Sequence, residues 1–171
     1  MSRAPRRKVF VSYHHTADAS WYDRFVDVFS ETYQIVRDNS VDRAIGSEDA
    51  DYVIRRIRDN YLTGSSATIV LCGKNTWGRK YVDWEILSSL NQRMGLVGLI
   101  LPSNVVGTDG KHVVPERLMD NIKQGYARWR VWSTVRSDPR KLSLLIEEAL
   151  TKDKGLIDNS RPKRLRNASL R

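Results

Sequence analysis

One continuous apolar run, Ala67 to Cys72, restricts how this chain can fold more than any other segment. Such a run is typical of a central strand that is buried on both faces of a parallel sheet. A second run, Leu96 to Leu101, has the same character. Between the two, Ile86, Leu90 and Met94 recur at helical spacing. The pattern therefore predicts a strand, a helix and a second strand in succession.

Strand-like and helix-like segments alternate along the rest of the chain as well. The expected strands are 8–13, 34–37, 67–72, 96–101 and, as an edge strand, 126–132. Helical periodicity begins at Asp18, after Ser47, around Glu85, within 113–123 and at Asp138. Such alternation favours a parallel sheet with right-handed crossovers. We therefore expect an α/β fold, namely a flavodoxin-like three-layer sandwich with a central five-stranded, mainly parallel sheet and helices on both faces.

The length of 171 residues and the hydrophobic content of 40% fit one folded domain. We expect a basic N-terminal leader at residues 1–7, a folded domain at residues 8–152, and a basic C-terminal tail at residues 153–171. The tail is polar and carries Pro162, so we expect it to fray.

The formal net charge of +9 is concentrated at the two ends of the chain. Residues 1–8 and 153–171 each contribute +4, which leaves +1 for residues 9–152. A nearly neutral body does not indicate a specific nucleic-acid interface. The sequence also has no apolar run of about 18 residues, as a membrane span requires. With Cys72 as the one cysteine, no intramolecular disulfide can form, and we expect a cytoplasmic protein that is not bound to a membrane.

The segment from Gly73 to Gly78 has the glycine spacing of a phosphate-binding loop, and it lies between a predicted strand and a predicted helix. A phosphate loop continues with Lys and then Ser or Thr. Here Arg79 and Lys80 follow the second glycine, so the hydroxyl that binds magnesium is missing. A nucleoside triphosphatase is therefore disfavoured.

Histidines are too few to indicate a metal site. His14 and His15 are adjacent, and His112 is the third histidine, with no cysteine pair to complete a ligand set. We expect no metal. Ser12, His14 and Asp18 resemble the residue types of a hydrolase triad, but the sequence around Ser12 is not a nucleophile elbow, which argues against that chemistry.

Four short segments occur in an order that points to one family. They are Lys8 to Tyr13, Arg37 to Val41, Ser65 to Leu71, and Asp83 to Ile86. Together they resemble the TIR-like family, and particularly its prokaryotic branch, which includes the TIR-like component of Thoeris antiphage systems. The resemblance covers about residues 8–150, so residues 8–152 would be the TIR-like domain. The loop at Asp42 to Glu48 departs from the longer acidic and glycine-containing loop of a typical TIR domain, so substrate entry is expected to differ.

The resemblance implies an activity and a catalytic residue. Catalytic members of the family cleave the bond between nicotinamide and ribose in NAD, and their catalytic glutamate matches Glu85. We place Glu85 in the first turn of its helix, where the positive end of the helix dipole keeps a carboxylate ionised. A fixed carboxylate can hold ribose hydroxyls and stabilise the oxocarbenium-like charge that grows as neutral nicotinamide leaves.

In the Thoeris branch the ADP-ribose part is closed into a cyclic signal that activates a separate effector. The resemblance therefore implies an enzyme of the NAD glycohydrolase or ADP-ribosyl cyclase type, for which NAD is a substrate and no cofactor is required. The implied partners are NAD and the effector, with a phage-derived trigger and a second copy of the chain as open alternatives. The alternative function is a non-catalytic signalling or adaptor module that acts by protein–protein interaction.

Positions at the ends of the predicted strands suggest a set of substrate-binding residues. They are Tyr13, His14, Asp38, Asn39, Lys74 and Trp84. Tyr13 or Trp84 could stack on a ring of the substrate, and Lys74 with Arg79 or Lys80 could neutralise its pyrophosphate. Each role has a structural alternative, namely core packing for Trp84, a solvated loop for the cations and a helix-start carboxylate for Glu85.

Overall fold

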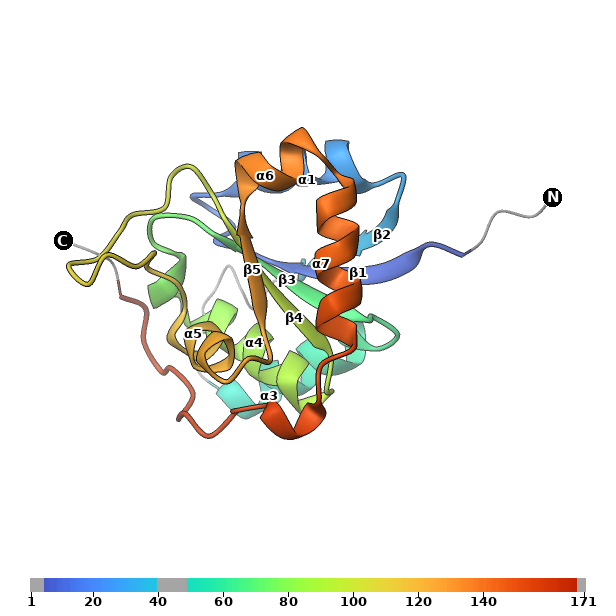
Figure 1. The fold of residues 1–171 in the computed structure, drawn as a ribbon. Coiled ribbons are helices and arrows are strands. Elements are labelled where there is room, and N and C mark those ends of the chain that lie inside the picture. Colours follow the sequence, from blue (N-terminus) through green and yellow to red (C-terminus); the bar gives the residue numbers. More distant parts are fainter. Residues whose placement is uncertain (1–4, 40–48, 169–171) are drawn as a thin grey trace.

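The computed structural model describes residues 5–39 and 49–168, and a five-stranded sheet forms its centre (Figure 1). The strands are β1 (Arg7–Ser12), β2 (Tyr33–Val36), β3 (Ala67–Cys72), β4 (Gly95–Ile100) and β5 (Arg128–Val131). Their order is β2-β1-β3-β4-β5, and every neighbouring pair is parallel. This confirms the predicted flavodoxin-like order, in which the direction of winding changes between β1 and β3.

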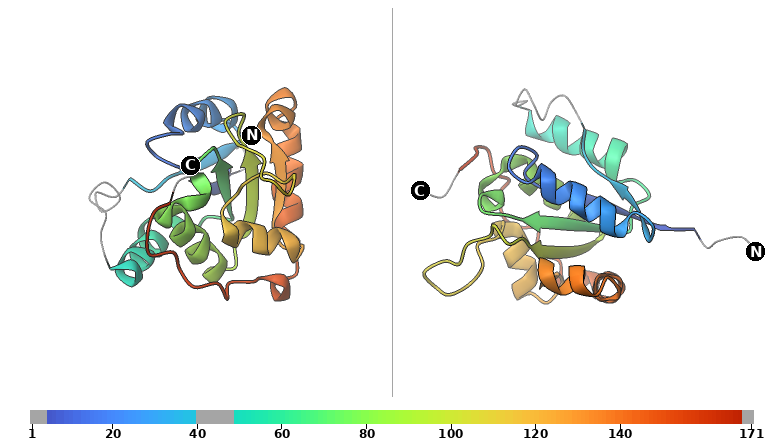
Figure 2. Two further views of the ribbon diagram at one scale, coloured as in Figure 1. Left: turned by 90° about the vertical axis from the view of Figure 1, so that its left-hand side faces the viewer. Right: turned by 90° about the horizontal axis from the view of Figure 1, so that it is seen from above.

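Helices cover both faces of this sheet, which confirms the predicted three-layer sandwich (Figure 2). One face carries α1 (Ala19–Phe29), α6 (Trp132–Ser137) and α7 (Arg140–Leu150). The other face carries α3 (Ala50–Ile57), α4 (Lys80–Asn91) and α5 (Glu116–Lys123). A π-helical turn (Arg58–Leu62) extends α3, and a 3-10 turn (Thr76–Gly78) precedes α4. Within the described residues, no helix is long and apolar enough to cross a membrane.

Side chains of β1 alternate between the two faces, and this decides which candidate residues can meet. Val11 packs in the core cluster under α1 and α7, whereas Phe10 packs in the cluster under α3 and α4. Because successive residues of a strand point to opposite faces, Ser12 faces α4 and Tyr13 faces α1. Tyr13 indeed belongs to the same core cluster as Val11.

The basic N-terminal segment joins the fold one residue earlier than expected. β1 begins at Arg7, whose Nε lies 2.9 Å from Oε1 of Glu147 on α7. The pairing of Arg7 with Tyr33 on β2 starts the parallel ladder at this residue. The expected Asp42 to Glu48 loop lies outside the described residues.

Residues 153–168 differ from the frayed tail that composition suggested. After a 3-10 turn at Lys154–Leu156, the chain runs along the outer side of α5 and α4 (Figure 2). Asn121 of α5 binds both main-chain groups of Asp158, since its Nδ2 donates to Asp158 O (2.8 Å) and its Oδ1 accepts from Asp158 N (2.9 Å). Polar side chains of neighbouring helices thus bind this segment, and composition does not reveal such partners.

Candidate functional site

Glu85 is the sixth residue of α4 and does not lie in its first turn, so the predicted position was wrong. The helix already begins at Lys80, because Tyr81 and Val82 pack into the two core clusters of this face. The acidic residue of the first turn is Asp83. The favourable interaction with the helix dipole therefore applies to Asp83 rather than to Glu85.

The Glu85 carboxylate lies at the carboxyl end of β1, in the interior of the protein. Its residue is 0% exposed, and its Oε1 accepts a hydrogen bond of 2.9 Å from Ser12 Oγ. Ser12 is the last residue of β1 and is also fully buried. A buried carboxylate is stable only when hydrogen bonds replace its hydration. The hydrogen bond from Ser12 therefore helps to stabilise the buried Glu85 carboxylate.

Asp38 lies on the same face of the sheet as Ser12 and Glu85. Val36, the last residue of β2, packs against the core cluster of α3 and α4, and so does Tyr61, with which Asp38 interacts. Asp38 is fully buried. Burial of Tyr61, and secondly the negative charge of Asp38, raises the pKa of Tyr61. The face that α3 and α4 cover thus carries the Ser12–Glu85 pair and a further carboxyl group, Asp38, and hydroxyl and carboxyl groups can bind sugar hydroxyls.

Tyr13 is placed on the opposite face of the sheet from Glu85. Its ring stacks on Tyr22 of α1 with centroids 4.7 Å apart, and its hydroxyl accepts a hydrogen bond of 2.6 Å from Arg37 Nη1. The residue is 1% exposed. The structure therefore uses this ring for core packing and does not bring it together with Glu85.

Trp84 packs in the core, which is the structural role that the sequence analysis gave as the alternative to substrate stacking. The residue is 1% exposed, and its ring centroid lies 5.0 Å from that of Tyr81. Its indole Nε1 donates a hydrogen bond of 2.8 Å to the main-chain oxygen of Arg164. Lys80 is buried as well, with Nζ 5.4 Å from the centre of the Trp84 ring.

The remaining predicted residues lie in the loops that follow the carboxyl ends of β1, β2 and β3. His14 is half-buried, and its Nδ1 accepts from the main-chain N–H of Ala17 (3.3 Å) in the turn before α1. Asn39 follows Asp38 and is exposed, as is Lys74 after β3. These three side chains are therefore near strand ends, as predicted.

A third buried carboxylate, Asp18, explains the glycine at position 73. Thr76 Oγ1 donates to Asp18 Oδ2 (3.2 Å) and accepts from the main-chain N–H of Gly73 (2.8 Å). A Cβ atom on Gly73 would lie 2.5 Å from Asp18 Oδ2, so only glycine fits. Burial raises the pKa of Asp18, and burial, assisted by the Asp18 charge, raises the pKa of the Cys72 thiol.

Sequence reasoning considered Ser12 only for a hydrolase triad and missed its hydrogen bond to Glu85. The signal that could have found it is the alternation along β1, because Phe10 and Ser12 share the face that α4 covers. Ser12 and Asp18 bond to different partners, so the hydrolase triad does not form. Among the described residues, no group of three or more His, Cys, Asp or Glu side chains could hold a metal ion.

Comparison with known proteins gives a matching family model and, among solved structures, a similar set of domains. The family model for the TIR-like domain of the Thoeris protein ThsB matches residues 10–105, more than half of the chain and a range that includes Ser12, Asp38 and Glu85. The TIR domains in the structure of the activated Roq1 resistosome, which directly recognises the pathogen effector XopQ, align over 87% of this chain and 84% of that chain, with 15% identity and a TM-score of 0.40. No curated protein matches the sequence.

Proposed function

The chain belongs to the TIR-like domain family of the Thoeris protein ThsB, and from that premise we propose that it is an NAD-processing enzyme. It cleaves the bond between nicotinamide and ribose and closes the ADP-ribose part into a cyclic signal. The signal activates a separate effector in antiphage defence, and the reaction takes place in the cytoplasm. The observation that carries the proposal is the Glu85 carboxylate, held by Ser12 at the carboxyl end of the parallel sheet.

In the proposed reaction, the bond between the ribose C1′ and the nicotinamide ring nitrogen breaks, and its electron pair leaves with nicotinamide. The leaving group is thereby neutral, and positive charge grows on the ribose. Glu85 holds ribose hydroxyls and offsets that charge, while Ser12 fixes one of its two oxygens. A nucleophilic atom of the same substrate then bonds to C1′ and gives a cyclic product, or water does so and gives a linear one. NAD is the substrate, and no cofactor or metal takes part.

Burial of the site bears on how the activity is controlled. Glu85, Ser12 and Asp38 are all fully buried, so the ribose reaches the carboxylate only after neighbouring groups move apart. Enzymes commonly couple such opening to a binding event. In this proposal, a phage-derived trigger or a second copy of the chain supplies that event.

The test is to incubate the purified protein with NAD, with and without lysate from phage-infected cells, and to follow nicotinamide and nucleotide products by mass spectrometry. Glu85→Gln removes the charge at nearly constant volume, and we expect nicotinamide release to fall by at least about 100-fold. Glu147→Gln makes the same chemical change on the surface of α7 and should leave turnover intact. Equal release by the parent and the Glu85→Gln variant would contradict the proposal.

Full burial of Glu85 is also the observation that favours a second candidate function, a non-catalytic adaptor. In that case the hydrogen bond from Ser12 is purely structural, and the module acts by protein–protein contacts. The outcome that identifies an adaptor is a Glu85→Gln protein that still protects cells from phage, combined with no NAD turnover by the parent in either condition.

A further inference from the structure

We infer that residues 158–168, here called the strap, dock on α4 and thereby position Glu85. The inference deepens the proposed function and rests on it for its catalytic readout. Two of its measurements do not depend on catalysis.

The strap supplies a side-chain cap for the N-terminus of α4. Arg79 occupies the N-cap position, and its side chain makes no capping hydrogen bond. Instead, the main-chain N–H of Lys80 donates to Oδ1 of Asn167 at 2.9 Å. Helices begin with main-chain N–H groups that have no partner within the helix, and a side-chain oxygen at this point stabilises the first turn.

A second pair of contacts ties the strap to the turn directly before Glu85. The main-chain N–H of Arg164 donates to Asp83 Oδ2 at 2.7 Å. The carbonyl of the same residue accepts the indole N–H of Trp84 at 2.8 Å. One strap residue thus holds two consecutive residues of α4, and Glu85 is the next residue along the helix.

The strap also completes the surroundings of a buried guanidinium. Arg117 of α5 is fully buried and pairs with Asp83, with Nε 2.8 Å from Oδ1. Its Nη1 donates to Asn159 Oδ1 (2.9 Å) and its Nη2 donates to the carbonyl of Pro162 (3.2 Å). A buried N–H group without an acceptor lowers the stability of the folded state. Because the strap supplies two acceptors for the Arg117 guanidinium, burial of the Arg117–Asp83 pair favours a docked strap.

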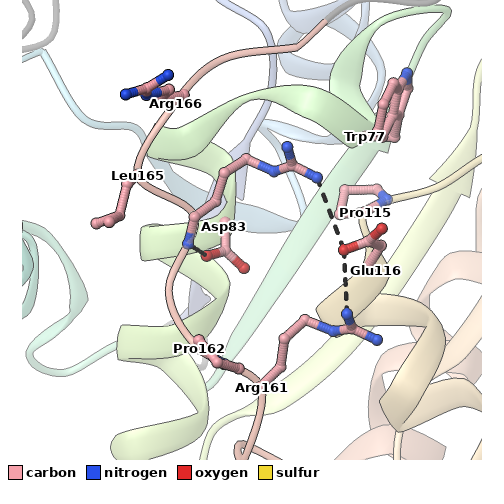
Figure 3. A pocket seen from close by; sticks show the side chains of 9 residues that line it. Trp77, Asp83, Pro115, Glu116, Arg161, Pro162, Leu165 and Arg166 are labelled. Atoms are coloured by element: carbon pink, nitrogen blue, oxygen red, sulfur yellow. Dashed lines mark hydrogen bonds and ion pairs between the residues drawn. The ribbon is translucent and has the colours of Figure 1, made fainter.

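An ionic latch closes the strap over the start of α5 (Figure 3). Glu116 Oε2 lies 3.2 Å from Arg161 Nη1 and 3.7 Å from Arg164 Nη2. Arg161 pairs in addition with Asp120, with Nε 2.8 Å from Oδ2. These partly exposed pairs are individually weak, but as a network they give the strap one register on α5.

The main chain of the strap lies very close to Gly78 at Ala168, the last residue of the strap. The main-chain N–H of Ala168 donates to Gly78 O at 2.8 Å. A Cβ atom on Gly78 would lie 2.1 Å from the carbonyl oxygen of Ala168. A side chain at this position is therefore incompatible with docking, which makes Gly78→Ala a variant that removes the strap contact without changing the strap.

The experiment compares four full-length variants. Gly78→Ala displaces the strap end, and Asn167→Ala removes the acceptor for Lys80. Asn167→Asp keeps an acceptor oxygen at that place. The matched control is Arg166→Gln, because Arg166 is exposed and its side chain points away from Glu116 (Figure 3).

Three quantities are measured on each variant. Proton exchange of the Trp84 indole N–H, followed by NMR and assigned with Trp84→Phe, reports docking. The carbon-13 shift of the Glu85 carboxyl group reports the position of that side chain. The kcat and KM for NAD report the reaction.

Gly78→Ala and Asn167→Ala should speed indole exchange at least about five-fold, shift the Glu85 resonance, and lower kcat more than they raise KM. Asn167→Asp and Arg166→Gln should behave like the parent. Faster exchange with an unchanged Glu85 resonance would overturn the positioning role, and unchanged exchange in both disrupting variants would overturn docking. Absence of NAD turnover by the parent, both with and without lysate from phage-infected cells, would count against the proposed function alone, because the two NMR measurements still decide the inference.

Discussion

Ser12 Oγ donates a hydrogen bond of 2.9 Å to Glu85 Oε1 and so joins the last residue of β1 to the middle of α4. Both residues are fully buried, and they are 73 positions apart in the chain. The contact therefore exists only in the folded protein, and the geometry of the candidate catalytic carboxylate depends on it.

Replacing Ser12 by alanine tests that dependence. The change leaves a buried carboxylate without this donor, so we expect the free energy of unfolding to fall by about 1–3 kcal/mol. Urea denaturation measures the effect. Ser137→Ala, at an exposed site, serves as the control, and similar stability losses for the two variants would contradict a special role for Ser12.

Asp18 should make stability depend on pH in a defined direction. Burial raises its pKa above the ordinary value of 3.8, and the hydrogen bond from Thr76 only partly opposes this. Between 3.8 and the raised pKa, the folded protein binds more protons at this site than the unfolded chain does. The contribution of Asp18 to stability is therefore fully present below the unfolded pKa and is lost as pH rises through the folded pKa.

The measurement is urea denaturation of the parent and of Asp18→Asn between about pH 4 and about pH 7. The stability of the variant relative to the parent should rise across this range, since the variant has no carboxyl group to ionise. Ser20→Ala, at an exposed position of α1, changes no titratable group and should show no such trend. A constant difference between the Asp18 variant and the parent would refute the expected direction.

Gly73→Ala should be destabilising through one contact. Its Cβ would lie 2.5 Å from Asp18 Oδ2, and relief of this overlap requires the surrounding structure to shift, at a cost of about 1–3 kcal/mol. Shortening the partner in the double variant with Asp18→Ala should recover part of the loss. A double-mutant cycle of unfolding free energies measures the coupling, and strictly additive effects would rule out this contact as the cause.

The buried Arg117–Asp83 pair should be far more sensitive than an exposed pair of the same kind. Asp83→Asn leaves the guanidinium buried without its counter-charge, and we expect a loss of about 3–5 kcal/mol. The comparison is Asp138→Asn, whose partner Arg140 is almost completely exposed, and which should change stability little. Equal losses in thermal or urea unfolding would show that the pair at Asp83 is not isolated from solvent.

Most of the fold could be predicted from local patterns. The uninterrupted apolar character of β3 and β4 follows from burial on both faces of a parallel sheet. The alternation of elements predicted that sheet, and five strands fit the flavodoxin-like order that the structure has. Glu85 and Asp38 were also predicted as site candidates, and they share one face of the sheet. Whether they act on a substrate stays a prediction.

Side-chain orientation could not be predicted as reliably, because it depends on where each element begins and on which face packs. Tyr13 was expected beside Glu85. It follows Ser12 directly, so its side chain points to the opposite face of the sheet and packs in the core cluster of α1. The earlier start of α4 moved Glu85 out of the first turn. A difference of a few residues in a boundary changes the partners of every side chain in the element.

The sequence of residues 8–152 by itself predicts a five-stranded parallel sheet, because hydrophobic periodicity and turn residues are local signals that involve only a few neighbouring residues. The hydrogen bond between Ser12 and Glu85, the fit of Asp18 against Gly73 and the capping of α4 by Asn167 join positions that are distant in the chain. No local pattern encodes such contacts, because their energies arise only when packing brings the partners together and removes water from between them.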